Sequence, residues 1–220
     1  MRKLVAGAMM SLDGAMQAPG GPDEDPTGGF KFGGWVFPHF DEAGGQAIDK
    51  LFAAPFDLLL GRKTYEIFAA YWPYMGPNDP IGQRFNKVTK YVATTSDMPL
   101  TWQNSVALHD AVRDLARLKQ QDGPVLLTQG STMLLQSLLK ADLIDEFRLF
   151  VFPVILGRGK RLFGEGTIPA GLELTESQVS PAGVTINTYV RAGDVKTGSF
   201  AQQSPSKEEL QRRERLKKEA

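Results

Sequence analysis

The stretch from Glu146 to Leu156 is apolar on both of its alternating faces. One face carries Phe147, Leu149 and Val151, and the other carries Phe150, Phe152 and Val154. A strand with one solvated face alternates between apolar and polar residues, whereas a strand that is apolar on both faces lies in a sheet covered on both sides. The chain is therefore expected to fold around a central strand, with helices on both faces of its sheet.

The segments before this strand are typical of alternating strands and helices. Two apolar runs, residues 56–60 and 125–128, each end at a glycine turn and continue into a helical pattern, and a further strand is expected over residues 90–96. The last strand is different, because residues 184–191 alternate between apolar and polar side chains as antiparallel strands do. This order predicts an α/β fold with a mixed, mainly parallel sheet, flanked by helices and carrying antiparallel strands at its C-terminal end.

Composition argues against several classes of function. The 25 basic and 25 acidic residues cancel, so no net charge directs the chain to nucleic acid or to an anionic membrane. The absence of Cys excludes disulfides and thiolate catalysis, and no apolar stretch approaches the roughly 20 residues of a membrane span. His39 and His109 stand far apart, so no metal site is expected. We expect a cytoplasmic protein whose partner is a small molecule.

The composition changes after Gly193. Residues 1–192 are expected to form one domain, and residues 193–220 a polar and charged tail. Within the tail, Ser206 and Glu209 form a capping box at the start of a short helix. Near the other end, the stretch from Asp13 to Gly34 is rich in Gly and Pro, and a loop of that length is usually a lid or a binding loop.

Groups suited to binding phosphate follow three of the predicted strands. They are Gly61-Arg62-Lys63-Thr64, Thr95-Ser96 and Gly130-Ser131-Thr132. Because parallel strands deliver their carboxyl ends to one edge of a sheet, these groups are expected to lie close together. Basic and hydroxyl side chains, together with the N–H groups at a helix N-terminus, attract anions. The edge therefore predicts a site for a nucleotide cofactor.

Five motifs occur in one combination along residues 2–192. They are Ser11-Leu12-Asp13-Gly14, Gly61-Arg62-Lys63-Thr64-Tyr65-Glu66, Gly130-Ser131 before a leucine-rich helix, Leu143-Ile144-Asp145-Glu146, and the stretch from Pro153 to Phe163. In this combination the chain resembles the dihydrofolate-reductase-like superfamily. The branch it resembles is the one shared with the reductase domain of bacterial riboflavin biosynthesis.

The resemblance implies an NADPH-dependent oxidoreductase with an eight-stranded mixed sheet and, by analogy, a homodimer. It assigns cofactor binding to Ser11, Gly61, Arg62, Lys63, Thr64, Thr95, Ser96, Gly130, Ser131 and Thr132. Within this set, Thr95 and Ser96 would lie near the adenosine 2′-phosphate, and the Gly130 turn would bring N–H groups to the pyrophosphate. Ser11 and Asp13 would lie on the loop beside the nicotinamide.

Two positions depart from the riboflavin branch. Gly7 stands where those reductases usually carry Lys, and Gln129 stands where they tend to have Glu. Both departures remove charges that would engage a ribityl or ribosyl phosphate. We expect instead hydride transfer to a conjugated C=N or C=O of a pterin- or pyrimidine-like heterocycle, with Trp35 and Gln129 as substrate-binding residues.

Two carboxylates are candidates for catalysis. Asp41 follows a Trp-x-x-Pro sequence that begins at Trp35, and could bind a pterin-like ring or donate a proton. Alternatively, Asp41 caps the helix that follows it. Asp13 could act beside the nicotinamide, or could hold its loop in an Asx turn. If neither residue acts in catalysis, the alternative is a noncatalytic nucleotide-binding or regulatory protein that retains the cofactor edge.

Overall fold

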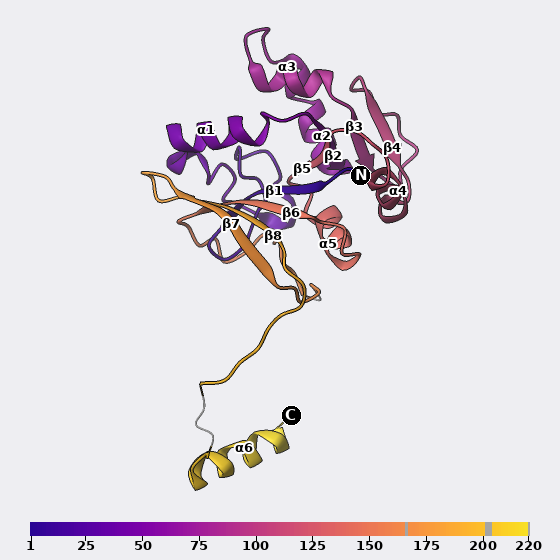
Figure 1. Ribbon diagram of the computed structural model, residues 1–220. Coiled ribbons are helices and arrows are strands. Elements are labelled where there is room, and N and C mark those ends of the chain that lie inside the picture. Colours follow the sequence, from indigo (N-terminus) through magenta and orange to yellow (C-terminus); the bar gives the residue numbers. More distant parts are fainter. Residues whose placement is uncertain (166, 201–203, 220) are drawn as a thin grey trace.

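One eight-stranded sheet organises the residues that the computed structural model describes, which are 1–165, 167–200 and 204–219 (Figure 1). The strands are β1 (Leu4–Ser11), β2 (Phe56–Gly61), β3 (Lys90–Ala93), β4 (Ser105–Leu108), β5 (Val125–Gln129), β6 (Glu146–Phe152), β7 (Leu172–Val179) and β8 (Thr185–Arg191). They lie in the order β4-β3-β2-β5-β1-β6-β8-β7. Neighbours from β4 to β6 are parallel, and β8 is antiparallel to β6 and β7. The predicted fold class is confirmed.

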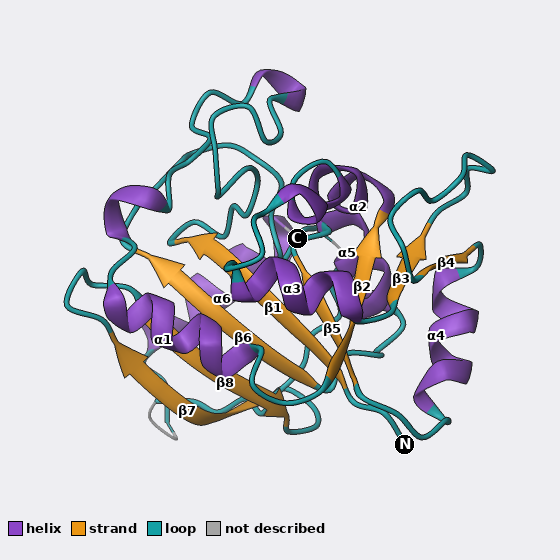
Figure 2. Ribbon diagram, turned by 90° about the horizontal axis from the view of Figure 1, so that it is seen from above, coloured by secondary structure: helices purple, strands orange, loops and turns teal. Residues whose placement is uncertain are grey.

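Helices cover both faces of this sheet. The helices that cover it are α1 (Glu42–Leu51), α2 (Arg62–Ala69), α3 (Pro80–Lys87), α4 (Ala111–Lys119) and α5 (Thr132–Lys140). Another helix, α6 (Lys207–Glu219), follows the last strand, and short 3-10 helices lie at Thr27–Gly29, Phe37–His39 and Trp72–Tyr74. Side chains from α1, α2 and α3 pack into one core layer, and those from α4 and α5 into the other. Figure 2 shows α1 and α3 lying across one face of the sheet.

The central strand β6 contributes to both core layers. Phe150 and Phe152 belong to the layer beneath α1, whereas Phe147 and Leu149 belong to the layer beneath α5. The expectation of a doubly covered strand is therefore confirmed. The strand ends at Phe152 rather than at the expected position 156, because the next residue is a proline, which has no N–H group for the ladder.

Three elements were not predicted from the sequence pattern. Strands β4 and β7 form the two edges of the sheet, and every residue of β7 is exposed. Helix α3 begins at Pro80, and the carboxylate of Asp79 accepts a hydrogen bond from the Gly82 amide at 2.7 Å. An Asp cap followed by Pro at the first helical position is a helix-start signal that is visible in the sequence.

The expected helix of the C-terminal tail is present as α6. The Ser206 hydroxyl accepts a hydrogen bond from the Glu209 amide at 3.2 Å, as in the predicted capping box. Figure 1 shows α6 set apart from the sheet. The domain boundary at residue 192 stays a prediction. Among the described residues, no helix is both long and apolar enough to cross a membrane.

Arg2 joins three strands at the edge where they begin. Its guanidinium forms a buried ion pair with Asp57 of β2, and its Nε donates to the carbonyl of Pro124, just before β5, at 2.6 Å. The same guanidinium lies over the ring of Tyr91 in β3, 5.5 Å from the ring centroid. Arg2 thus fixes the amino ends of the parallel strands.

Lys90 is a fully buried cation at the start of β3. Its ammonium group donates to three carbonyl groups at the end of α3, those of Phe85 at 2.7 Å, Asn86 at 3.3 Å and Val88 at 2.9 Å. It also lies 4.4 Å from the centroid of the Trp102 ring. The carbonyl groups that α3 leaves unpaired are satisfied in this way. Burial lowers the pKa of Lys90 to about 8.

This pKa makes stability depend on pH in alkaline solution. The folded protein releases the Lys90 proton near pH 8, while the unfolded chain keeps it up to its ordinary value of 10.5. Because the unfolded state then binds more protons, the Lys90 contribution to the free energy of unfolding should rise with pH, by up to about 1.4 kcal/mol per pH unit. Wild type and Lys90→Met would be denatured at several pH values between 7.5 and 9.5. The free energy of unfolding of wild type minus that of the variant should increase with pH. A constant difference, or the same trend in exposed Lys87→Met, would contradict this expectation.

Candidate functional site at the carboxyl edge of the sheet

The two glycine junctions predicted from the sequence contact one another. The Gly61 amide at the end of β2 donates a hydrogen bond to the Ser131 hydroxyl, which follows β5, at 2.8 Å. This contact follows from the parallel pairing of β2 with β5, which places the two turns side by side. The structure therefore brings the N-termini of α2 and α5 together at one place, called here the carboxyl edge.

These two helices begin without a side-chain cap. Helices α1, α3 and α4 are capped by the carboxylates of Asp41, Asp79 and Asp110, whereas α2 and α5 start at Gly61 and Ser131 with no side-chain cap hydrogen bond. The Ser131 hydroxyl is turned to Gly61 instead of to its own helix. The first N–H groups of α2 and α5 thus have no side-chain partner among the described residues, and such groups bind anions.

The turn before α5 has an unusual backbone. Both Gly130 and Ser131 are left-handed, with φ values of 69° and 66°. Serine seldom adopts this conformation, which costs roughly 1–2 kcal/mol in a residue with a side chain. Thr64 lies close by, since a Cβ atom added to Gly130 would be 3.7 Å from Thr64 Cγ2. The turn therefore directs its backbone toward the first turn of α2.

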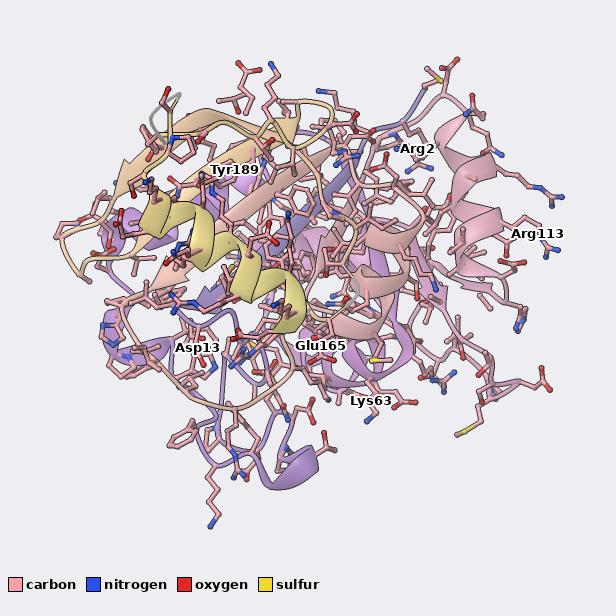
Figure 3. All side chains as sticks on the ribbon, turned by 90° about the horizontal axis from the view of Figure 1, so that it is seen from below. Arg2, Asp13, Lys63, Arg113, Glu165 and Tyr189 are labelled. Atoms are coloured by element: carbon pink, nitrogen blue, oxygen red, sulfur yellow. The ribbon has the colours of Figure 1, made fainter. Side chains whose placement is uncertain are left out.

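Two cationic side chains stand at the start of α2. Arg62 donates from Nε to Glu66 at 2.6 Å and from Nη1 to the Met98 carbonyl at 3.0 Å, while its Nη2 has no hydrogen-bond partner among the described residues. Lys63 is exposed and makes no hydrogen bond or ion pair with any residue that the structure describes. Figure 3 shows Lys63 and Asp13 on one side of the molecule and Arg2 on the opposite side. Positive charge is thus available at the carboxyl edge.

The hydroxyl groups after β3 form a compact turn beside α2. The Thr94 hydroxyl accepts from the Ser96 amide at 3.0 Å, and the Ser96 hydroxyl accepts from the Met98 amide at 3.2 Å. Thr95 is exposed between them. Because Arg62 also contacts Met98, this turn and the start of α2 are held together. The predicted pair, Thr95 and Ser96, therefore lies next to Arg62.

Ser11 and Asp13 join two loops. The fully buried Ser11 hydroxyl donates to Asp13 Oδ1 at 2.6 Å and accepts from the Ala15 amide at 3.0 Å. Asp13 also accepts from the amides of Leu156 at 3.1 Å and Gly157 at 2.9 Å, in the loop after β6. The Ser11 hydrogen bond, followed by those of the two amides, lowers the pKa of Asp13 below its ordinary value, although partial burial opposes the shift.

These contacts are those expected if Asp13 holds its loop in place, which is the alternative to a catalytic role. Its carboxylate is ionised at neutral pH and has the wrong charge state for a proton donor. The Ser11 hydroxyl is enclosed, so a contact between this residue and a cofactor would have to use another group. The catalytic role of Asp13 and the cofactor-binding role of Ser11 stay predictions.

Asp41 is the N-cap of α1. Its Oδ1 accepts from the Gly44 amide at 2.9 Å, and its Oδ2 accepts from the Ala182 amide, in the turn before β8, at 2.9 Å. These two hydrogen bonds, in that order, lower the pKa of Asp41 below its ordinary value. The capping alternative is confirmed, and both oxygens already have backbone partners. The catalytic role of Asp41 stays a prediction that these contacts do not support.

The two expected substrate-binding residues differ in exposure. Trp35 is buried in the core, with its ring 5.4 Å from that of Phe152 and its Nε1 donating to the Gln17 carbonyl at 2.9 Å. Gln129 is half-buried at the end of β5, and its register partner on β1 is Gly7. The contact between Gln129 and Gly7 was not predicted, because no sequence pattern reveals the register of two strands so far apart in the chain.

Two cavities are lined by residues other than those of the α2 and α5 N-termini. One, of about 300 Å³, lies near the amino end of β6 and the carboxyl end of β8, and its lining includes Phe147, Phe163 and the ion pair between Asp142 and Arg191. The other, of about 270 Å³, lies between the loop before α1 and the loop after β6. None of the residues predicted to bind the cofactor lines either cavity. Among the described residues, no group of His, Asp and Glu side chains is arranged to hold a metal ion.

Replacing Asp13 should loosen the two loops that it joins. Asp13→Asn removes the charge that strengthens the hydrogen bonds from Leu156 and Gly157, and should lower the free energy of unfolding by about 1–3 kcal/mol. Hydrogen exchange should accelerate most at these two amides. Asp23→Asn, an exposed change in the same long loop, serves as the control. Unchanged exchange at residues 156 and 157 would show that Asp13 does not hold the loop.

The sequence is similar to those of a known protein family and of a bacterial protein. Residues 2–186 match the family described as the RibD C-terminal domain. The protein YwjB of Bacillus subtilis, itself uncharacterised, is 29% identical over 192 residues, which are 87% of this chain and 99% of YwjB.

Two solved structures share the fold. A structure from Shewanella sp. PV-4 that is named for riboflavin biosynthesis has a TM-score of 0.55 and 22% identity, covering 86% of this chain and 99% of its own. The dihydrofolate reductase of Enterococcus faecalis, in complex with NADP(H), has a TM-score of 0.54 and 17% identity, covering 86% of this chain and 96% of its own. With a family match over nearly its whole folded part, this chain belongs to the RibD C-terminal domain family and has the dihydrofolate-reductase-like fold.

Proposed function

We propose that this protein is an NADPH-dependent reductase that transfers a hydride to a conjugated C=N or C=O group of a small pterin- or pyrimidine-like heterocycle. The observation that carries the proposal is the meeting of two uncapped helix N-termini, those of α2 and α5, at the carboxyl edge. Family membership and the NADP(H) complex of a structural neighbour support the same class of cofactor.

The residues at this edge fit a phosphate-rich dinucleotide. The backbone N–H groups that follow Gly61 and Ser131 would hold the pyrophosphate, because the helix termini supply both donors and a favourable dipole. Lys63 and Nη2 of Arg62 would hold the adenosine 2′-phosphate, with Thr95 and Ser96 beside them. Thr64 would add a hydroxyl donor next to Gly130. When bound, NADPH would supply the hydride, and the chain would orient the nicotinamide against the acceptor.

Neither candidate carboxylate is suited to donate the proton. The hydrogen bond from the Ser11 hydroxyl, followed by those from two backbone amides, lowers the pKa of Asp13, and hydrogen bonds from backbone amides lower the pKa of Asp41, so that each is ionised near neutral pH. A general acid would need a raised pKa. This observation favours a second candidate, a noncatalytic nucleotide-binding or regulatory protein. In the reductase, we propose that the proton reaches the substrate from water.

An assay of cofactor oxidation separates these two functions. Purified protein would be mixed with NADPH and, in turn, with dihydrofolate, pterins and pyrimidinones, while loss of the NADPH absorbance is followed. We expect NADPH to bind and one class of acceptor to be reduced. Tight NADPH binding without oxidation by any acceptor would support the noncatalytic candidate, and no nucleotide binding at all would refute the cofactor edge.

Lys63 provides a test of cofactor choice that does not depend on turnover. It has no partner among the described residues, so Lys63→Ala should leave folding intact. Loss of a charge-assisted contact to the 2′-phosphate should raise the Kd for NADPH about tenfold and leave the Kd for NADH within about twofold. Lys87→Ala, at the exposed end of α3, is the matched control. Equal weakening of both cofactors would instead place Lys63 at the pyrophosphate.

A further inference from the structure

The smaller of the two cavities lies between two loops that are far apart in the sequence. It has a volume of about 270 Å³, and its lining includes Thr27, Gly28, Phe30, Arg158, Gly159 and Lys160. The first three of these residues belong to the long loop before α1, and the last three belong to the loop after β6. None of them has a part in the proposed function. We call this space the loop cavity.

The walls of the loop cavity are held in place by Gln17, which is buried and also lines it. Its Nε2 donates to the carbonyl groups of Asp25 and Thr27, each at 2.9 Å. Its Oε1 accepts from the Lys160 amide at 3.2 Å, so one side chain joins both loops. A ligand therefore meets a cavity that is already formed, and little further ordering of the loops opposes its binding.

The two cations of the cavity lining differ in their partners. The Lys160 ammonium forms an ion pair with Asp25 and donates to the Thr27 hydroxyl at 3.1 Å. Arg158 is exposed and makes one long hydrogen bond, from Nη1 to the Gly29 carbonyl at 3.5 Å. It has no carboxylate partner among the described residues. The lining thus carries one positive charge that is not neutralised, on a guanidinium whose other N–H donors are available.

Beside this charge the lining is apolar and flat. The ring of Phe30 is buried, and the backbone of Gly159 lies against it, since a Cβ atom added to Gly159 would be 3.0 Å from Phe30 Cε2. Gly159 has a φ of 115°, which also favours glycine. Gly28, on the other loop, has open space around its Cβ position. An aromatic ring and two residues without side chains leave room for a flat group next to Arg158.

We propose that the loop cavity binds a small organic monocarboxylate, whose carboxylate pairs with Arg158 and whose flat ring lies against Phe30. A guanidinium can donate two parallel hydrogen bonds to one carboxylate. A phosphate monoester carries nearly two charges at neutral pH, and only one would be neutralised, because Lys160 is already paired with Asp25. A carboxylate is therefore the better match. This site goes beyond the proposed reductase function and does not depend on it.

The first test compares ligands of one shape and different charge. Benzoate, benzamide and phenyl phosphate would be added to the full chain, while the backbone amide signals of Gly28, Gly29 and Gly159 are followed by ¹H–¹⁵N NMR. Benzoate should shift these signals with a Kd at least tenfold lower than that of benzamide, which has no charge. Equal affinity for the two, or tighter binding of phenyl phosphate, would overturn the proposal.

A comparison of carboxylates tests the role of the ring. Acetate has the charge without the ring, so it should bind at least threefold more weakly than benzoate. Equal binding of acetate and benzoate would overturn the contact with Phe30. Cinnamate and 2-naphthoate extend the flat group. If none of the three aromatic carboxylates shifts the amides of Gly28, Gly29 and Gly159, the proposal fails.

Substitution of Arg158 separates this site from other places where an anion could bind. Arg158→Gln should raise the Kd for benzoate at least tenfold and leave the Kd for benzamide within about twofold. Arg158→Lys keeps the charge without the planar fork and should give an intermediate Kd. Arg117→Gln, an exposed change on α4, is the matched control and should bind benzoate like wild type.

Benzoate binding that is unchanged in Arg158→Gln would overturn the proposal. Arg158 is exposed, so a thermal melt should show that this variant stays folded. The failure of this proposal and that of the proposed function are distinguishable. Benzoate that binds through Arg158 to a protein without affinity for NADPH would leave the loop cavity assigned and refute the cofactor edge, and the converse result would do the opposite.

Discussion

The hydrogen bond from the Gly61 amide to the Ser131 hydroxyl holds the starts of α2 and α5 together. Two unfavourable features accompany this hydrogen bond. Ser131 has a left-handed backbone, and its hydroxyl does not cap its own helix, as serine often does at this position. Both features lie at the carboxyl edge, where the first N–H groups of α2 and α5 have no side-chain partner among the described residues. Strain of this kind is common at functional sites, where the surrounding structure maintains it.

The fold was predictable from the sequence where burial was complete. The two apolar faces of β6 gave a strong periodic signal, because its apolar side chains meet both core layers. The glycine junctions after β2 and β5 were weak signals singly and were informative only in combination. The edge strands β4 and β7 gave weak signals, because an exposed edge places little constraint on its side chains. Helix α3 was missed even though Asp79 and Pro80 form a recognisable start.

The site was predictable only in part. Parallel strands end at one edge, so the proximity of the groups after β2, β3 and β5 followed from the fold class alone. The contact of Gln129 with Gly7 depends on strand register, and the two amides that donate to Asp13 lie more than 140 residues away, in the loop after β6. Neither relation leaves a local pattern. Asp41 showed the opposite case, since a local cap signal predicted its hydrogen bond to Gly44.

The loop that contains Asp13 and the loop after β6 form one mechanical unit. Besides the Asp13 carboxylate, the Met16 amide donates to the Lys160 carbonyl at 2.8 Å and the Leu162 amide donates to the Gly14 carbonyl at 3.1 Å. A displacement of either loop at this point must break these bonds or carry the other loop with it. Motions of these two segments, which are far apart in the sequence, are therefore expected to be correlated.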